Sequence, residues 1–527
     1  MTLHSGLPFC AMLLATAPAA AQWPTIDPAG LPGTRILAGG GKMPPEVYAR
    51  FLALAGSPER ARVVLIPTAS GRADEAAERD KTLARWRADH PGYAFEALHT
   101  RDRATADRED FTAPLRSATA VWLGGGVQQN LADAYLGTRV ERELQALLAR
   151  GGVVGGTSAG TAIQTKVMIA SGKEAPVMAT GFDFVPGAIS DQHFLARKRL
   201  PRLQQALALH PGCFGLGIDE GTAVEIGGRT LTVHGASKAL LVLGATPMDA
   251  GRVVELAAGG RADLVTWQRA ARARLDVLRS PRVERGALVL VGGGRIPPAA
   301  VARFTALAGG SKAKVVLVPG AMPAGDGGGD EPFARLLKDA GVADVRTLSC
   351  RHPREVTKEA LAVLADATGV WFGGGRQWRL VDAFDGTDAL AAFHAVLARG
   401  GVIGGTSAGA TIQGEFLVRG NPLGNTEMWC PGYDRGFGFL PGVAIDQHFV
   451  ARNREADLRG LIARLPRYVG LGVDEGTAAV VQGSLLDVVG DGTVAVIDAR
   501  ADATKLAPTW LRSGERWDLV AGAKPAD

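Results

Sequence analysis

A Gly-Gly-Thr-Ser-Ala-Gly segment occurs twice in the sequence, at residues 155–160 and again at residues 404–409. Each copy follows a short apolar run of the kind that forms a buried strand, and each precedes residues that can begin a helix. A G-x-S-x-G pattern in this setting holds a serine hydroxyl clear of the backbone at a sharp turn. Its glycines let the chain turn without Cβ clashes. We therefore predict acyl-transfer chemistry with Ser158 and Ser407 as nucleophiles.

A serine nucleophile needs a base that takes its proton and a third group that orients that base. Each half of the chain has one histidine in an Asp-Gln-His-Phe segment and, just after a later apolar run, one pair of acids. The histidines are His193 and His448, and the pairs are Asp219-Glu220 and Asp474-Glu475. Because successive strand residues face opposite sides, we expect one acid of each pair to point into the site. The order Ser–His–acid disfavours an α/β-hydrolase, which runs Ser–acid–His.

Acyl transfer also needs N–H donors for the negative charge of the tetrahedral intermediate. The amide of the residue that follows each serine is one candidate donor. A Gly-Gly-Gly loop at residues 124–126 and 373–375 is the other, because glycine lets backbone amides approach closely. The predicted oxyanion residues are Gly126, Ala159, Gly375 and Ala408.

The similarity between the two halves extends well beyond these segments. Ser158 and Ser407 lie 249 residues apart, whereas His193 and His448 lie 255 apart, so the second half has six more residues between serine and histidine. Thr-Trp pairs at 266–267 and 509–510 extend the match toward the ends. A repeat of this length indicates domain duplication rather than a solenoid, and 527 residues suit two domains. We expect the repeats to span 30–280 and 283–522.

Apolar strands bounded by glycine alternate with helical segments along the first repeat. We expect strands at 35–41, 62–67 and 120–123, and helices at 44–56, 74–90 and 140–150. This alternation predicts an α/β fold, with two tandem doubly wound parallel-sheet domains. Sites in such sheets lie at the C-terminal ends of the strands. Residues 250–285, rich in arginine and helix formers, are expected to close the first repeat and link the halves.

Charge and hydropathy indicate which partners and which location to expect for the protein. The net charge of +5 is mild for this length and no basic run would follow a phosphate backbone, so we expect no nucleic-acid partner. Residues 1–21 are apolar and end in Ala-Ala-Ala, which predicts a signal peptide and a periplasmic or secreted protein. They contain no Lys or Arg, and a disordered alanine-rich leader is the alternative. No other stretch is long enough to span a membrane.

The motifs together resemble the serine peptidases that include cyanophycinase and aspartyl dipeptidase E. The resemblance rests on the elbow at 404–410 and on Asp-Gln-His-Phe-x-x-Arg-x-Arg-x-x-Arg-Leu at 191–203. It implies a sheet like that of class I glutamine amidotransferases, Glu220 and Glu475 as the orienting acids, and no metal or cofactor. It also implies a set of substrate-site residues: Gln128, Asp191, Gln192, Arg197, Arg199, Arg202, Gln377, Asp446, Gln447, Arg452 and Arg454.

The arginines of this set suit bidentate binding of carboxylates. The implied substrate is cyanophycin, a poly-aspartate chain with arginine on each side-chain carboxyl, and the implied product is the β-aspartyl-arginine dipeptide. An aspartyl dipeptidase and a non-catalytic polymer-binding protein are the alternatives. Each half departs from the motif once. Repeat one has Thr161 in place of alanine, and repeat two has Asp457 in place of the third arginine, with Arg459 as a candidate replacement.

Overall fold

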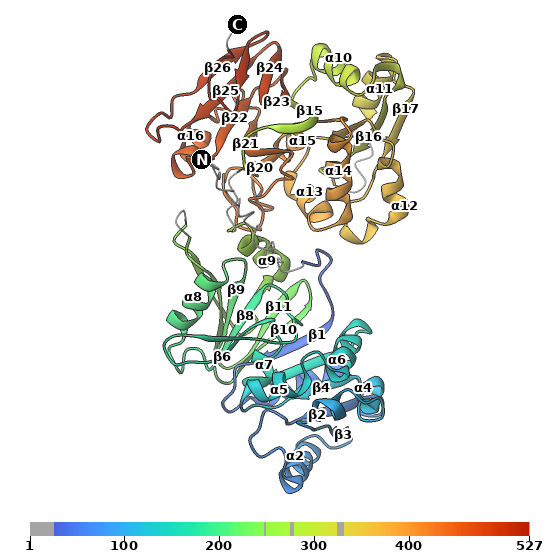
Figure 1. The fold of residues 1–527 in the computed structure, drawn as a ribbon, viewed down its shortest axis with the longest axis vertical. Coiled ribbons are helices and arrows are strands. Elements are labelled where there is room, and N and C mark those ends of the chain that lie inside the picture. Colours follow the sequence, from blue (N-terminus) through green and yellow to red (C-terminus); the bar gives the residue numbers. More distant parts are fainter. Residues whose placement is uncertain (1–25, 247–248, 275–278, 324–330, 526–527) are drawn as a thin grey trace, which may run out of the picture.

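The computed structural model describes residues 26–246, 249–274, 279–323 and 331–525, so the predicted leader at 1–21 lies outside the described residues. Figure 1 shows two halves stacked along the long axis, with the first repeat in blue to green and the second in yellow to red. Each half is built on an eight-stranded sheet and a smaller second sheet. The chain is therefore a tandem of two similar α/β units.

The main sheet of repeat one has a parallel part in the order β1-β5-β4-β2-β3. Its strands are β1 (Leu31–Ala38), β2 (Arg62–Ile66), β3 (Ala94–Ala97), β4 (Ala120–Leu123) and β5 (Val153–Thr157). Helices on its faces include α1 (Pro45–Ala55), α2 (Ala76–Asp89), α5 (Gln128–Tyr135) and α6 (Arg139–Ala149), with short α3 (Arg103–Ala106) and α4 (Ala113–Ser117) between. Helix α1 begins with proline and buries Val47, Phe51 and Leu52 along one stripe. The predicted parallel α/β core is confirmed.

Three antiparallel strands extend this sheet beyond β1, so the whole sheet is mixed rather than purely parallel. They are β10 (Thr222–Gly228), β11 (Thr230–Gly235) and β14 (Arg261–Asp263). A single residue separates β10 from β11, and a connection this short permits only an antiparallel hairpin. Antiparallel pairing of β1 with β10 brings Ala38 opposite Ala223, which sets the ends of the two strands side by side.

The second sheet of repeat one contains Asp191 and Gln192, directly before His193. It contains β8 (Ala188–Gln192), β9 (Phe214–Ile218), β12 (Lys238–Leu243) and β13 (Arg252–Ala257), and a hairpin of β6 (Val167–Ser171) and β7 (Val177–Thr180) lies apart from it. Strands β8 and β9 are parallel and are joined through α8 (Leu200–Leu209). The ends of β8 and β9 therefore deliver the histidine and the acid pair to the same edge.

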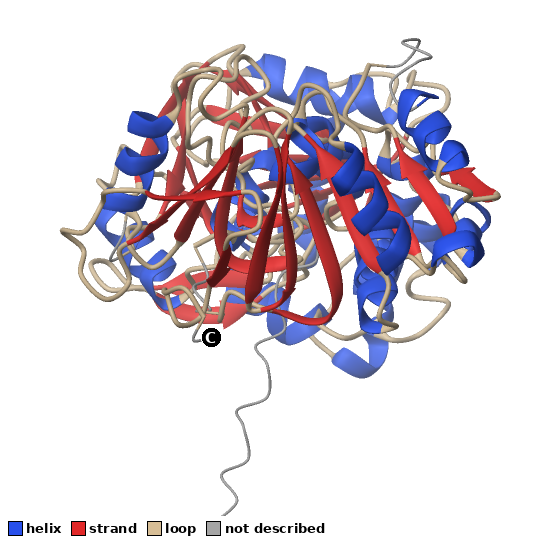
Figure 2. Cartoon of the chain, turned by 90° about the horizontal axis from the view of Figure 1, so that it is seen from above, coloured by secondary structure: helices blue, strands red, loops and turns tan. Residues whose placement is uncertain are grey.

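Repeat two follows the same order. Its main sheet contains β15 (Val283–Val291), β16 (Lys314–Val318), β17 (Asp344–Thr347), β18 (Gly369–Phe372), β19 (Val402–Thr406), β23 (Thr477–Gly483), β24 (Leu485–Gly490) and β27 (Arg516–Asp518). Its second sheet contains β20 (Gly414–Phe416), β21 (Leu440–Gln447), β22 (Val469–Val473), β25 (Thr493–Asp498) and β26 (Thr509–Arg512). Its helices are α10 (Pro298–Leu307), α11 (Glu331–Asp339), α12 (Lys358–Leu361), α13 (Gln377–Phe384), α14 (Asp388–Ala398), α15 (Ala408–Thr411) and α16 (Glu455–Arg464). Figure 2 shows helices packed around the twisted fan of strands.

The segment 250–285 differs from the expectation of a helical linker. It supplies β13 and β14 to the two sheets and then forms α9 (Leu264–Arg272), which lies at the junction of the halves (Figure 1). Consequently Thr266 and Trp267 are helical, whereas Thr509 and Trp510 lie in strand β26. The matching Thr-Trp pairs are thus not structurally equivalent, because β26 pairs with β25 in the way that β13, an earlier strand, pairs with β12 in repeat one.

Ion pairs join α9 of repeat one to α13 of repeat two. Arg269, whose side chain is 4% exposed, donates to Asp382 at 2.7 Å and to Asp385 at 2.8 Å. Arg272 also pairs with Asp385 at 2.8 Å. Burial alone would raise the pKa of Asp385, but the neighbouring charges of Arg272 and Arg269 outweigh it and leave that pKa below its usual value. These contacts fix the two repeats against each other.

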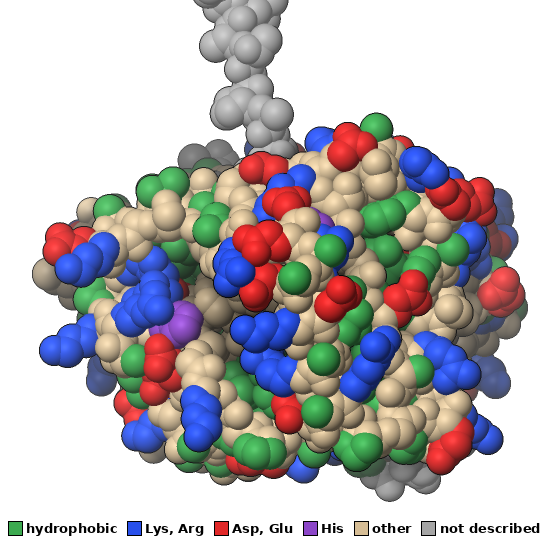
Figure 3. All heavy atoms as spheres, turned by 90° about the horizontal axis from the view of Figure 1, so that it is seen from below, with side chains coloured by type: hydrophobic (Ala, Val, Ile, Leu, Met, Phe, Trp, Pro, Cys, Tyr) green, Lys and Arg blue, Asp and Glu red, His purple; other side chains and the backbone are tan. Residues whose placement is uncertain are grey.

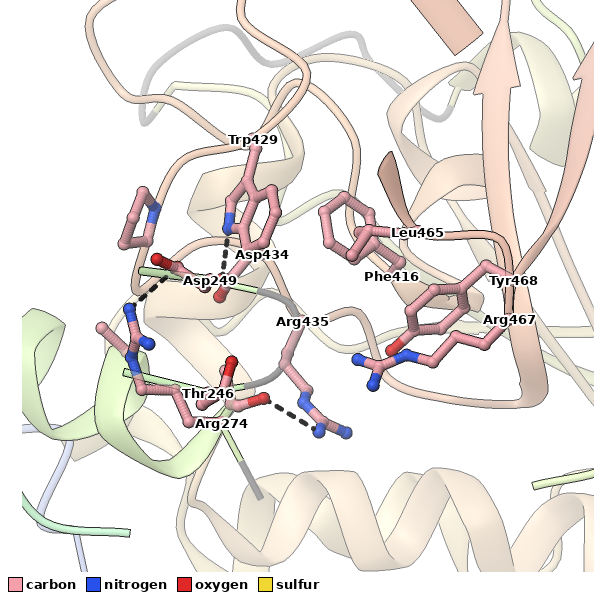
Figure 4. A pocket seen from close by; sticks show the side chains of 13 residues that line it. Thr246, Asp249, Arg274, Phe416, Trp429, Asp434, Arg435, Leu465, Arg467 and Tyr468 are labelled. Atoms are coloured by element: carbon pink, nitrogen blue, oxygen red, sulfur yellow. Dashed lines mark hydrogen bonds and ion pairs between the residues drawn. The ribbon is translucent and has the colours of Figure 1, made fainter. Parts of the chain in front are cut away.

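A small cavity lies beside this junction (Figure 4). Its wall combines Arg274, which pairs with Asp249 at 2.9 Å, and Trp429, whose indole N–H donates to Asp434 at 2.8 Å. The cavity volume is about 40 Å³, which accommodates a few water molecules. It is too small for a peptide, so it is not the substrate site that the sequence predicts. None of the helices in the described ranges is long and apolar enough to cross a bilayer.

Candidate active site

Each serine of the repeated Gly-Gly-Thr-Ser-Ala-Gly segment sits at a strained turn between a strand and a short helix. Ser158 joins β5 to α7 (Ala159–Ala162) with a φ of 50°, and Ser407 joins β19 to α15 with a φ of 54°. Few non-glycine residues adopt this left-handed region, and such strain is concentrated at functional sites. The turn is tight as well, because a Cβ added to Gly160 would lie 2.1 Å from the carbonyl oxygen of Leu123. Only glycine therefore fits beside the serine.

The predicted base and acid lie in line with each serine. Ser158 Oγ is 3.0 Å from His193 Nε2, and His193 Nδ1 is 2.6 Å from Glu220 Oε1. In repeat two the corresponding distances are 3.0 Å between Ser407 and His448, and 2.5 Å between His448 and Glu475. These are the separations required for a hydroxyl nucleophile, a general base and a group that orients the base. The structure therefore brings together all six predicted catalytic residues.

The two acids of each pair have separate partners. Asp219 turns away from His193 and accepts hydrogen bonds from the amides of Leu195 and Ala196 at 3.0 and 2.9 Å. Asp474 accepts from the amides of Val450 and Ala451 in the same way. The aspartates thus fix the loop that follows each histidine, and the glutamates contact the histidine rings. Residue order alone left this choice open, and the geometry agrees with what the resemblance implied.

Glycines at the end of the first strand of each repeat form the other wall of the site. A Cβ on Gly40 would lie 2.4 Å from the ring of His193, and a Cβ on Gly293 would lie 2.2 Å from the ring of His448. The histidines therefore have room only because these positions lack side chains. The sequence reasoning missed their role, although the Gly-Gly-Gly segments at 39–41 and 292–294 repeat like the motifs that it used.

The predicted oxyanion residues lie around each serine with free amides. A Cβ on Gly125 would be 3.7 Å from Ser158 Cβ, which places the loop that ends in Gly126 against the nucleophile. Within the described ranges the amides of Gly126 and Ala159 donate no hydrogen bond, and the same holds for Gly375 and Ala408. Free N–H groups beside a nucleophile are suited to an oxyanion.

Most predicted substrate residues of repeat one contact other protein groups. The side chain of Asp191 is fully buried and pairs with Arg199 at 3.2 Å and with Arg202. Burial raises the pKa of Asp191, although both arginines oppose the shift. Gln128 donates to the carbonyl oxygens of Ile169 and Ala170 at 2.8 and 2.7 Å, and Gln192 donates to Ser190 at 3.2 Å.

Arg197 and Arg452 are the exposed members of the set, one in each repeat. Neither guanidinium makes a hydrogen bond or an ion pair with any residue that the structure describes. Arg452 lies near enough to His448 to lower the pKa of that histidine, although burial is the larger cause of the shift. These two arginines are thus available to a substrate carboxylate beside each base.

Repeat two surrounds its buried aspartate with a different arginine. Asp446 pairs with Arg454 at 3.0 Å, as expected from repeat one, and with Arg419 at 3.0 Å. Arg419 also reaches Asp457 at 2.8 Å, at the position where repeat one has Arg202. The candidate replacement Arg459 instead pairs with Glu455 at 3.6 Å on the exposed face of α16.

Sequence reasoning missed Arg419, although one signal was present. Position 419 corresponds to Ala170 at the 249-residue offset, so the arginine lost at one position reappears at another. The glutamines beside these sites also match, because Gln377 donates to the carbonyl oxygens of Val418 and Arg419 at 2.8 and 2.9 Å. Gln447 Oε1 is buried and has no hydrogen-bond partner in the described part of the chain, which leaves an acceptor available beside His448.

Comparison with known proteins agrees with this geometry. The model of the peptidase family S51 matches residues 36–234 and 288–489. Cyanophycinase from Trichormus variabilis is 32% identical over 231 residues, which cover 42% of this chain and 76% of that protein. Cyanophycinase from Geminocystis herdmanii is 31% identical over 203 residues, which cover 38% of this chain and 74% of that protein. A solved peptidase from an acI-B1 actinobacterium is 24% identical, with a TM-score of 0.37, and covers 45% of this chain and 98% of that one.

The family match covers both repeats and includes both serine elbows and both histidines. The chain therefore belongs to peptidase family S51, as a tandem pair of serine-type peptidase domains.

Proposed function

We propose that this protein hydrolyses cyanophycin to β-aspartyl-arginine dipeptides through an acyl-enzyme, with one site in each of the two domains at 30–280 and 283–522. The hydrogen-bonded chain of serine, histidine and glutamate, present in both repeats, carries the proposal. The cyanophycinases that match about two fifths of the chain support the choice of substrate.

In the acylation step, Ser158 Oγ attacks the carbonyl carbon of an aspartyl residue, and the serine proton moves to His193 Nε2. Glu220 holds the ring by its Nδ1–H and stabilises the imidazolium. The amides of Ala159 and the 124–126 loop take the charge of the tetrahedral oxygen. When the intermediate collapses, His193 gives its proton to the leaving amine and an ester to Ser158 remains.

In the deacylation step, water attacks the ester carbonyl and gives its proton to His193. Collapse of the second intermediate breaks the bond to Ser158 Oγ, which takes the proton back. The product leaves with a new carboxyl group, and the triad returns to its first state. Ser407, His448 and Glu475 perform the same steps in repeat two.

In the proposed substrate each aspartyl side-chain carboxyl is bonded to an arginine whose own α-carboxylate is free, and the exposed arginines of the protein suit such carboxylates. Arg197 follows His193 by four residues, and Arg452 follows His448 by four. Each presents a guanidinium fork that pairs with none of the described residues, where a carboxylate can be bound by two parallel hydrogen bonds. The buried Asp191 and Asp446 are already paired with other arginines.

We also propose that residues 1–21 direct the protein out of the cytoplasm. Amino-terminal sequencing of protein recovered from the periplasm or the medium should begin at Gln22. Recovery of the intact amino terminus from the cytoplasm alone would contradict export.

The test of the activity uses purified insoluble cyanophycin with wild type, Ser158→Ala, Ser407→Ala and the double variant. Mass spectrometry of the soluble fraction should detect β-aspartyl-arginine with wild type and none with the double variant. A folded wild type that releases no dipeptide, or a double variant that still releases it, would overturn the proposal. Release from small aspartyl dipeptides with the polymer untouched would indicate a dipeptidase.

A further inference from the structure

A second cavity lies beside the triad of repeat one. Its volume is about 380 Å³, within the range of roughly 300–1,000 Å³ typical of small-molecule sites. Gly41 lies on its wall, and a Cβ added to Gly41 would be 2.9 Å from Glu220 Oε2. The cavity therefore adjoins the triad on the side of its glutamate.

Three aromatic rings form a fixed wall of this cavity. The rings of Tyr48 and Trp86 meet edge to face with centroids 5.1 Å apart, and His90 lies 5.5 Å from Trp86 and 6.1 Å from Tyr48. Tyr48 comes from α1, whereas Trp86 and His90 come from the end of α2. Trp86 is 6% exposed and anchors the other two rings. Such a wall is a surface on which a guanidinium can stack.

Charged side chains of both signs surround the same cavity. Lys42, Arg85 and Asp89 are exposed, and none of them forms an ion pair or a hydrogen bond within the described ranges. Arg85 and Asp89 lie four residues apart on α2 but do not pair. Figure 3 views the molecule from the end formed by repeat one and shows basic and acidic side chains interspersed over that face.

We propose that this cavity is an accessory binding site for a peptide chain that carries both carboxylates and guanidinium groups, and that it holds the polymer next to the triad of repeat one. Lys42 and Arg85 bind carboxylates, and Asp89 with the aromatic wall binds a guanidinium. This assignment rests on the proposed function for its substrate class. Binding at a second point raises the concentration of the polymer at the triad without changing the chemical step.

Repeat two lacks the same wall. The position that corresponds to Tyr48 is Val301, which is buried, and the position that corresponds to Lys42 is Arg295, which pairs with Asp491 at 3.4 Å. Phe333 fills the space over Trp371, with ring centroids 3.7 Å apart. The accessory site therefore belongs to repeat one, and its effects should be confined to that half.

The first experiment uses Ser407→Ala, so that only repeat one is active, and adds Lys42→Glu with Arg85→Glu. The KM for cyanophycin should rise about tenfold, because the polymer loses its charge contacts with Lys42 and Arg85. The kcat for a short (β-Asp-Arg)₂ substrate should stay within about twofold, since this substrate is too short to span both sites. Lys81→Glu reverses a single charge on α2 outside the cavity and should alter neither value.

The second experiment does not depend on hydrolysis. The inactive variant Ser158→Ala with Ser407→Ala should co-sediment with cyanophycin granules. Adding Lys42→Glu with Arg85→Glu should reduce the bound fraction severalfold, whereas adding Lys81→Glu should not. Unchanged sedimentation and unchanged polymer KM would overturn the accessory site while the proposed function stands. A wild type that releases no dipeptide would refute the proposed function, and sedimentation would still decide whether the cavity binds the polymer.

Discussion

The two repeats neutralise equivalent buried carboxylates with arginines from different elements. In repeat one, Arg202 on α8 reaches Asp191, whose side chain is fully buried. In repeat two, the equivalent helix position is Asp457, and Arg419 reaches Asp446 from the segment that follows β20. Each buried carboxylate thus keeps two guanidinium partners, as an uncompensated buried charge would require.

The comparison shows that the requirement is two guanidinium partners for the buried carboxylate. The sequence motif describes only one arrangement of arginines that meets it. Read along the sequence, Asp457 suggests a weakened second site. In the structure, Asp457 is a second acceptor for Arg419, which adopts a left-handed φ of 55° to reach both carboxylates. The loss of an arginine at one position and its gain at another leave the charge balance intact.

The departure in repeat one is also accommodated. Thr161, where the motif has alanine, is fully buried, and its hydroxyl lies 2.8 Å from the carbonyl oxygens of Ala38 and Gly156. A buried hydroxyl with an acceptor is tolerated, whereas one without a partner would be costly. Neither departure therefore removes a group from the triad.

The largest expected effect comes from replacing the glutamate of each triad, and it should be equal in the two repeats. Glu220→Gln in the Ser407→Ala background, and Glu475→Gln in the Ser158→Ala background, should each lower kcat by about 10³–10⁴-fold, because the amide stabilises the wrong tautomer of histidine. Asp219→Asn and Asp474→Asn are the matched controls, and each should cost less than about tenfold, since asparagine still accepts from the loop amides. Steady-state hydrolysis measures all four. Equal losses for glutamate and aspartate variants would refute their separate roles.

The next test removes the arginine that distinguishes repeat two. Arg419→Ala leaves the carboxylate of Asp446 with one partner, and repeat two should lose about 3–5 kcal/mol of stability. Adding Asp457→Arg, which recreates the arrangement of repeat one, should restore much of this loss. Chemical denaturation and the activity of the Ser158→Ala background both report the effect. Failure of Asp457→Arg to improve Arg419→Ala would contradict the exchange of roles.

A smaller effect is expected at the junction, where α9 of repeat one lies against α13 of repeat two. Asp385→Ala should cost about 1.5–3 kcal/mol, because Arg269 loses a buried charged partner but keeps Asp382. The lowered pKa of Asp385 means that its contribution is present above the usual carboxyl range and disappears as pH falls through that lowered value. Asp133→Ala on α5, which corresponds to Asp382, is the control and should cost under about 0.5 kcal/mol. Thermal unfolding at neutral pH compares them.

The smallest expected difference concerns pH. Burial, with the nearby charges of Arg452 and Arg454, lowers the pKa of His448 from its usual 6.5, although Glu475 opposes the shift. A base must be neutral, so kcat/KM of the Ser158→Ala variant should fall only below pH 6.5. Arg452→Ala should move the midpoint upward by a fraction of a unit. A midpoint at or above 6.5 in the Ser158→Ala variant would contradict the effect of burial.

The sequence was sufficient for the parallel core and for the residues around the nucleophile. Short apolar runs predicted β2 and β4, and α1, α2 and α6 lie within about two residues of their expected ranges. Local patterns of this kind need no knowledge of distant contacts. The antiparallel extension was missed because β14 has only three residues and pairs with a strand some thirty residues earlier.

Other features depend on contacts that no local pattern encodes. Whether Asp219 or Glu220 faces the histidine depends on the turn after β9, and the position of Arg419 depends on how the segment after β20 lies against β21. Comparison of the repeats position by position would have found Arg419 and the second Gly-Gly-Gly segment. The same comparison would not have predicted α9 at the end of repeat one, because repeat two has strand β26 at the matching Thr-Trp pair.

The most direct test of the central claim, that one chain contains two assembled serine sites, is active-site labelling with a fluorophosphonate followed by intact-mass measurement. Wild type should gain two adducts per chain, Ser158→Ala and Ser407→Ala one each, and the double variant none. One adduct on wild type, found at the same serine in every preparation of folded protein, would show that only one of the two triads is competent.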